Sequence, residues 1–112
     1  KTITRDVAPA SSGTPETLYT VQSGSTVIIL GLFLANVHTS QVTASVTLVS
    51  TTTQTSQTQN TTAYLVKDVA IPSGSSLSVL DGKIVANVGD IIKIDCSVAD
   101  KVSVVMSYME IT

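Results

Sequence analysis

Two side chains belong to the types that most often carry nucleophilic or acid–base chemistry, and each is the only one of its kind. His38 is the single histidine and Cys96 the single cysteine. A cysteine nucleophile needs a neighbouring base, for which His38 is the only histidine candidate, and a zinc site needs several ligands. Cys96 alternates in phase with Ile92 and Ile94, which favours a buried strand position. We therefore predict a turn histidine, a core cysteine and no internal disulfide.

Four carboxylates in the second half of the chain could bind a cation or act in pairs on a glycosidic bond: Asp81, Asp90, Asp95 and Asp100. Their spacing lacks the pattern of calcium-binding loops, and those beside glycines are typical of turns. Four Phe and Tyr residues offer little surface on which sugars could stack, so a hydrolase is the least favoured interpretation. Asn60-Thr61-Thr62 matches a glycosylation acceptor, which matters only in a eukaryotic secretory pathway. The sequence predicts no catalytic residue, no metal site and no cofactor.

Size and charge restrict the partners. The 112 residues fit one domain. A net charge of −2 without a basic cluster, and without Trp, argues against nucleic acid. The longest apolar run, residues 27–35, is much shorter than the roughly 18 residues that a membrane-spanning helix needs. The first residues also lack the apolar centre of a secretion signal.

Charges are absent from a large part of the chain. Residues 17–66 contain no Asp, Glu, Lys or Arg. Soluble monomers usually intersperse charges over their surface, so this distribution favours a protein covered by another copy or by a larger assembly. Hydroxyl groups are the alternative source of solubility, because 32 residues are Ser or Thr.

Short β-prone segments dominate the pattern. Residues 42–48 alternate apolar and hydroxyl side chains, so one face of this strand is apolar and the other polar. Residues 27–34 are apolar on both sides, which suits a strand buried on both faces or one with its second face against a partner. We expect Leu30 and Val46 to be core residues, at which Asp would prevent folding. The last strand, residues 102–111, has two apolar sides: Val104, Met106 and Tyr108 on one, and Val105, Met109 and Ile111 on the other.

Glycine-containing turns separate these segments. Gln-Ser-Gly-Ser (22–25), Pro-Ser-Gly-Ser (72–75) and Val-Gly-Asp (88–90) each precede an apolar run, and Asp81-Gly82 predicts a tight hairpin. Turn signals about 8–12 residues apart are typical of β-sandwiches and barrels. We predict an all-β, jelly-roll-like antiparallel sandwich of seven or eight strands.

The predicted sandwich domain covers residues 18–112 and is preceded by an extended N-terminal arm, residues 1–17. The two prolines and small polar residues of the arm favour this form. Within the arm, residues 2–7 could add an edge strand to this chain or to a neighbour.

A polar insertion, residues 50–62, consists of Ser, Thr, Gln and Asn alone. It is predicted to be the distal part of a hairpin between strands 42–49 and 63–71. One interpretation is a loop without a partner, and the other is an arm that bonds to a neighbouring subunit without the desolvation cost of charges. The second interpretation gives these contact residues, including two from the N-terminal segment: Thr53, Gln54, Gln57, Gln59, Ile3 and Val7.

Several segments together resemble a known group of proteins. They are Thr-Val-Ile-Ile-Leu-Gly-Leu-Phe-Leu-Ala-Asn (26–36), the alternating segment 39–49, the segment 64–94 with Ile-Pro-Ser-Gly-Ser and Val-Leu-Asp-Gly-Lys, and the closing Ser-Tyr-Met-Glu-Ile-Thr (107–112). This series resembles small virion structural proteins of tailed bacteriophages, including phages of cyanobacteria. The resemblance implies a non-enzymatic β-sandwich attached to the virion.

Within such a particle the favoured role is a capsid cement or decoration protein on the capsid exterior. A neck, tail or fibre subunit is the second interpretation, and a carbohydrate- or surface-binding adhesin module is an alternative of another class. The expected partners are further copies of the chain, as a dimer or trimer, and the major capsid protein or other virion subunits. Neither nucleic acid nor a membrane is expected as a partner.

Overall fold

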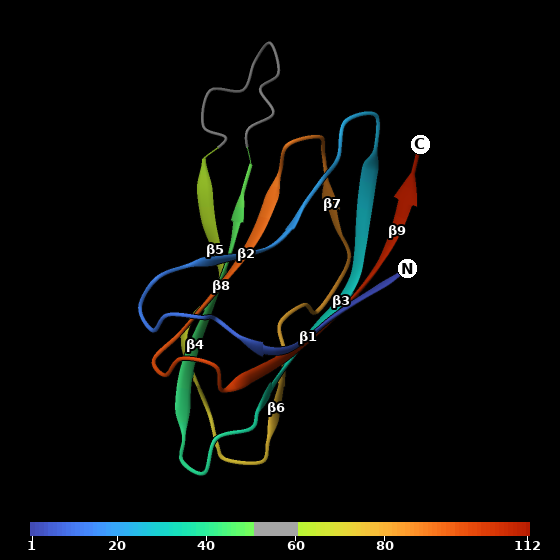
Figure 1. Ribbon diagram of the computed structural model, residues 1–112. Coiled ribbons are helices and arrows are strands. Elements are labelled where there is room, and N and C mark those ends of the chain that lie inside the picture. Colours follow the sequence, from blue (N-terminus) through green and yellow to red (C-terminus); the bar gives the residue numbers. More distant parts are fainter. Residues whose placement is uncertain (51–60) are drawn as a thin grey trace.

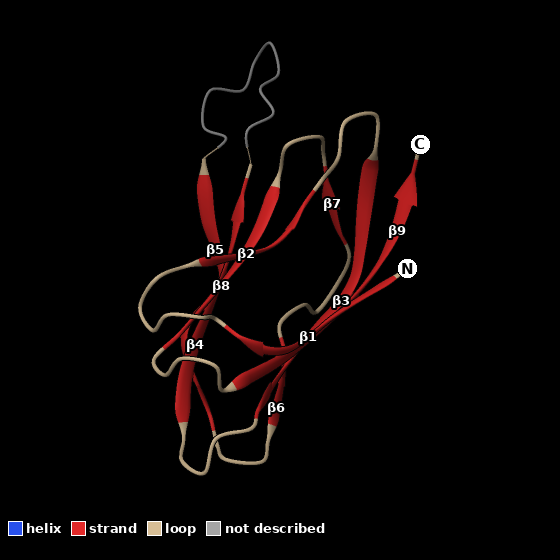
Figure 2. Ribbon diagram, in the orientation of Figure 1, coloured by secondary structure: helices blue, strands red, loops and turns tan. Residues whose placement is uncertain are grey.

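The computed structural model describes residues 1–50 and 61–112, and two antiparallel sheets make up this part of the chain (Figures 1 and 2). The prediction of an all-β fold is confirmed. The described residues form nine strands rather than seven or eight, and two of them, β6 and β7, have only three residues each. The strands are β1 (Thr2–Ala8), β2 (Glu16–Thr20), β3 (Thr26–Asn36), β4 (Val42–Val49), β5 (Thr62–Ile71), β6 (Ser76–Ser78), β7 (Ile84–Ala86), β8 (Ile91–Cys96) and β9 (Val102–Ile111).

The strand pairs are nested along the chain. In one sheet the order is β1-β9-β3-β6, with β7 also paired to β3, and in the other it is β2-β8-β4-β5. Thus β1 pairs with β9, β2 with β8, β3 with β6 and β7, and β4 with β5. The two ends of the chain meet in one sheet, and the β4–β5 hairpin is the innermost pair (Figure 1).

A β-bulge in β3 determines which of its side chains enter the core. Ile29 pairs with Tyr108 and Gly31 with Ser107, so Leu30 and Gly31 together face a single residue of β9. The alternation therefore changes phase: Ile29 is buried before the bulge and Leu32 after it. The prediction that Leu30 is a core residue is wrong, since its side chain points outward and is 44% exposed.

The core lies between the inner faces of the two sheets. Val46 of β4 is fully buried, as predicted, and Cys96 is a buried free cysteine. Twelve side chains are both large and fully buried: Ile29, Leu32, Leu34, Ile71, Ile92, Ile94, Met106, Val27, Val42, Val46, Val102 and Val104. Burial of this apolar surface is the main stabilising contribution to the fold.

Turn chemistry was predicted correctly at three glycines and incorrectly at one. Gly24, Gly74 and Gly89 have positive φ, the conformation that glycine adopts at least cost. Asp81-Gly82 does not form a tight hairpin, because β6 and β7 on either side of it both pair with β3 and not with each other.

The N-terminal segment is integrated into the sandwich. Residues 2–8 form the edge strand β1, which pairs with β9 of this chain. Arg5 on β1 joins the two sheets, since its guanidinium forms an ion pair with Glu16 and donates to the carbonyl oxygen of Thr17 at 3.1 Å, both on β2. Edge strand β1 is thereby tied to the opposite layer.

A pair of substitutions tests this assignment of faces. Val46→Asp would bury an unpaired carboxylate, so we expect it to prevent folding. Leu30→Asp places the same group on an exposed position, and we expect that variant to keep the dispersed amide spectrum of the folded chain. A collapsed spectrum for Leu30→Asp would contradict the position of the bulge in β3, and a dispersed one for Val46→Asp would contradict the inward face of β4.

Candidate functional site

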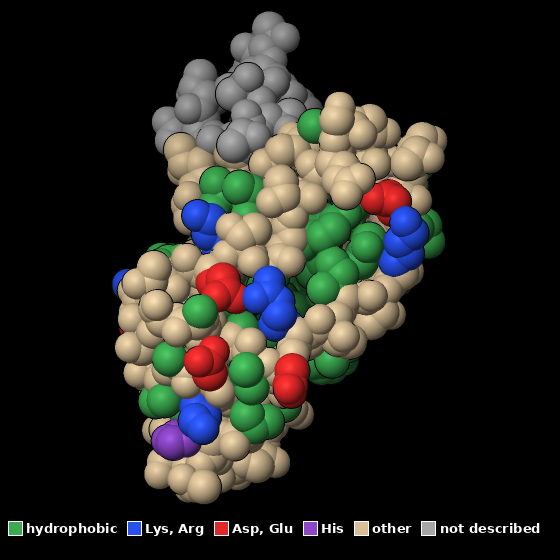
Figure 3. All heavy atoms as spheres, in the orientation of Figure 1, with side chains coloured by type: hydrophobic (Ala, Val, Ile, Leu, Met, Phe, Trp, Pro, Cys, Tyr) green, Lys and Arg blue, Asp and Glu red, His purple; other side chains and the backbone are tan. Residues whose placement is uncertain are grey.

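The outer faces of the two sheets differ in chemistry. On the second sheet, the outward side of β4 carries Thr43, Ser45 and Thr47, and Ser45 and Thr47 pair across the strands with Asp95 and Lys93 of β8. This outer face is polar, as the alternation of residues 42–48 predicted. Figure 3 shows one side of the molecule, where charged side chains are scattered and hydrophobic ones gather between the sheets.

The outer face of the first sheet is mainly apolar along β3, β7 and β9. Six large hydrophobic side chains with an exposed fraction of 39–58% point outward from β3, β7 and β9. We call this set the apolar outer face: Leu30, Phe33, Val85, Val105, Met109 and Ile111. Single exposed hydrophobic residues are ordinary, whereas a contiguous group of this kind marks a site of association.

Strand register makes this face continuous. Phe33 lies directly opposite Val105, and Ile28 lies between Met109 on β9 and Val85 on β7. The bulge adds Leu30 to the same side, and the ring of Phe33 lies beside Gly31, with its nearest carbon 3.5 Å from where a Cβ would stand. The bulge thus leaves room for the aromatic ring to lie along the strand.

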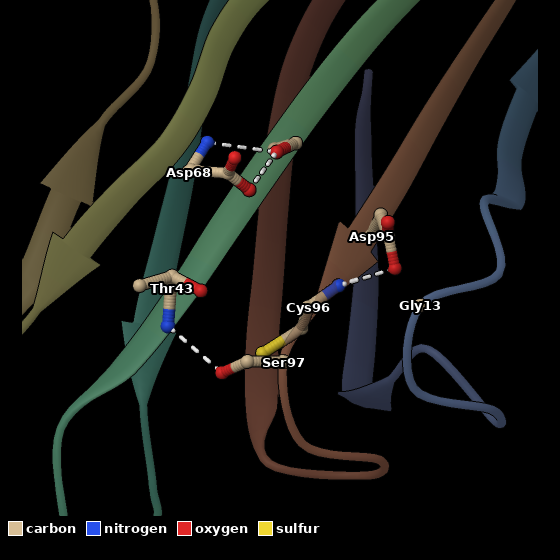
Figure 4. Close-up of a pocket in the computed structure, with 7 residues that line it drawn as sticks. Gly13, Thr43, Asp68, Asp95, Cys96 and Ser97 are labelled. Carbon is tan, nitrogen blue, oxygen red and sulfur yellow. Dashed lines mark hydrogen bonds between the residues drawn. The ribbon is translucent and has the colours of Figure 1, made fainter.

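A polar pocket of about 150 Å³ opens on the other outer face (Figure 4). Its lining comes from β4, β5, β8, the residue that follows β8 and the loop before β2: Gly13, Thr43, Ser45, Asp68, Asp95, Cys96 and Ser97. Asp68 lies in a second bulge, where two residues of β5 face Ser45, and has a positive φ of 49°. Its backbone N–H donates to Ser45 Oγ at 2.8 Å.

The pocket's polar groups bond mainly to one another. Ser97 Oγ accepts from the Thr43 backbone N–H at 3.0 Å, and an Asp95 carboxylate oxygen accepts from the Cys96 N–H at 2.8 Å. The Cys96 side chain is buried, and His38 is not in the lining. Within residues 1–50 and 61–112, no three His, Cys, Asp or Glu side chains are placed to hold a metal ion. The contacts in the pocket fix the bulge of β5 against β4.

Two groups with a shifted pKa, Tyr19 and Lys1, lie where the two ends of the chain come close to β2. Burial, and then the neighbouring Tyr108, raise the pKa of Tyr19, whose ring centroid is 5.0 Å from that of Tyr108. Lys1 Nζ bonds to Glu110 at 2.8 Å, which raises the pKa of Lys1 above its ordinary value. Both shifts move the groups further from neutral pH, so neither is adapted to acid–base catalysis there.

The predicted contact residues are distributed as follows. Ile3 on β1 is half-buried and packs against the core, whereas Val7 is 37% exposed at an irregularity of the same strand. Four predicted residues lie outside the described part of the chain: Thr53, Gln54, Gln57 and Gln59. The strands that flank them pair as predicted, and the Ser50 N–H donates to the Thr61 carbonyl oxygen at 2.9 Å.

The apolar outer face was not among the predicted site residues, although the sequence contained its signal. Val105, Met109 and Ile111 form the second apolar side of the last strand, and residues 27–34 are apolar on both sides. The pocket had no comparable signal, because the bulge of β5 between Val66 and Val69 is defined only by the register of β5 against β4.

Comparison with known proteins identifies no relative. No protein-family model, curated protein or solved structure matches the chain. Among the described residues, no helix is long and apolar enough to span a membrane.

Removing the hydroxyl of Ser45 tests the structural role of the pocket. Ser45→Ala leaves the partly buried Asp68 N–H without its acceptor, so we expect the free energy of unfolding to fall by about 1–3 kcal/mol. Ser97→Ala is the matched control, because the Thr43 N–H that it frees is exposed and can bond to water. Urea unfolding measures both, and equal losses for the two variants would contradict this role.

Proposed function

We propose that this chain is a structural protein of a phage virion, a cement or decoration protein that stabilises the head by bridging capsid subunits. It works without catalysis or a cofactor, on the capsid exterior, with the major capsid protein and further copies of itself as partners. The observation that carries this proposal is the apolar outer face, which gathers six of the ten exposed large hydrophobic side chains of the described residues into a surface suited to a protein neighbour.

The order of the strands supports the proposal. Nested pairs from β1–β9 to β4–β5, distributed over two facing sheets, are the arrangement expected of a jelly roll, a single long hairpin rolled into a double layer. Jelly rolls are found in viral capsid proteins and in lectins. Fold alone does not determine function. The strand order therefore supports a virion role only generally, and the specific support comes from the apolar outer face.

Two further segments are suited to capsid contacts. Edge strand β1 carries the exposed Val7, and its outer edge lies at one end of the sheet order, where a neighbour can pair with it. The second segment is the polar insertion between β4 and β5, with Thr53, Gln54, Gln57 and Gln59. Residues 1–17 contribute through the outer edge of β1 rather than through a free tail, because Ile3 packs against the core of this chain.

The location on the particle tests the proposal. A cement protein is expected in hundreds of copies on the head, visible by electron microscopy of particles that carry a labelled chain. Tens of copies at the neck or tail would favour the alternative of a neck, tail or fibre subunit. Binding of the purified chain to host glycans, without any particle, would favour an adhesin.

Deletion of residues 51–61, with the hairpin closed by Asn-Gly, tests the contribution of the polar insertion. Val49 and Thr62, which pair across the hairpin, are retained, so we expect the domain to fold. Particles assembled with this variant are expected to lose infectivity at a lower temperature than wild-type particles. Unchanged heat resistance would show that the polar insertion does not contact the capsid.

A further inference from the structure

The apolar outer face has the dimensions of a protein–protein interface. Strand β3 has 11 residues and spans about 36 Å, and the sheet around it is about 14 Å wide. These lengths give a footprint of at most about 500 Å² per copy, so two copies would bury about 1,000 Å² together, which is the lower limit for a specific interface. An aromatic anchor, Phe33, is 47% exposed within it.

The charge distribution identifies the kind of partner. Neither β3 nor β7 contains a charged residue. Glu110, the only charged residue of β9, is in the opposite phase to Met109 and bonds to Lys1 Nζ. A partner with a basic or acidic surface would bury its charges here without compensation. A partner whose own surface is neutral and apolar would bury no uncompensated charge here.

We propose that the partner is a second copy of this chain, and that two copies stack their apolar outer faces about a twofold axis. Each copy then offers the other a face of equal size and without charge, which is what a twofold contact requires. This inference rests on the proposed function, which includes self-association, and it identifies the apolar outer face as the surface through which the copies associate. The polar outer faces of both copies, with their pockets, remain free.

Sheet packing gives the contact its geometry. Sheets that pack face to face lie about 10 Å apart, with strands crossing at about 30° because each sheet is twisted. The dimer is accordingly a stack of four sheets, with the two first sheets in the middle. Leu30, at the bulge, lies in the middle of the apolar outer face, with Phe33 and Val105 toward one end of it.

Sedimentation velocity of the purified chain over a concentration series tests this contact. The chain has a mass of 11.6 kDa, and we expect a species of twice this mass at micromolar concentration. Phe33→Asp places one carboxylate from each copy in the contact. The dissociation constant of the dimer should therefore rise about 100-fold or more. Leu30→Asp should act in the same direction.

Tyr64→Asp is the matched control, because Tyr64 is a comparably exposed aromatic residue on β5 of the other sheet. It should leave the mass unchanged. Amide spectra establish whether each variant is folded. If Phe33→Asp or Leu30→Asp does not fold, Met109→Lys on the same face takes its place in the sedimentation experiment.

A wild-type monomer at millimolar concentration, a trimer, or dimers that persist in all folded face variants would overturn the inference. Because the experiment uses the isolated chain, a monomer would not contradict attachment to the virion, which the imaging of particles tests separately.

Discussion

The register of β3 against β9 is the constraint on which both faces of the first sheet depend. A bulge of one residue at Leu30 shifts the alternation, so that Ile29 and Leu32 enter the core while Leu30 and Phe33 point outward. Without it, one half of β3 would turn its apolar residues away from the core. The same bulge brings the outward residues of β3 beside Val105 and Met109, and it thereby makes one continuous surface.

The two sheets differ in the chemistry of their outer faces. In the second sheet, serine hydroxyls on the outer face accept hydrogen bonds from backbone N–H groups around the bulge at Asp68, so these groups are satisfied within the chain. In the first sheet, the apolar outer face exposes hydrophobic side chains to water and has the size of a small interface. The cross-sheet contacts of Arg5 with β2 hold these layers together at the edge where the chain begins.

How far the sequence could predict the structure depended on whether a strand's alternation was uninterrupted. Residues 42–48 alternate without a break, and the buried Val46 and the outward Ser45 were both predicted correctly. Leu30 was placed wrongly, because its bulge is set by pairing with β9, far away in the chain. For the same reason the pairing of β6 and β7 was predicted wrongly as a hairpin at Asp81-Gly82, since both strands pair with β3, which is distant in the chain. The apolar outer face was indicated by Met109 and Ile111, but a surplus of apolar residues does not by itself tell core from contact surface.

Isotope-filtered nuclear magnetic resonance on a mixture of labelled and unlabelled chains tests the central claim most directly. The experiment detects only contacts between different copies. If the apolar outer face joins two copies, the ring protons of Phe33 and the methyl group of Met109 will show contacts to the unlabelled chain. Intermolecular contacts confined to the polar outer face around Ser45, or none at concentrations where the chain associates, would contradict the account.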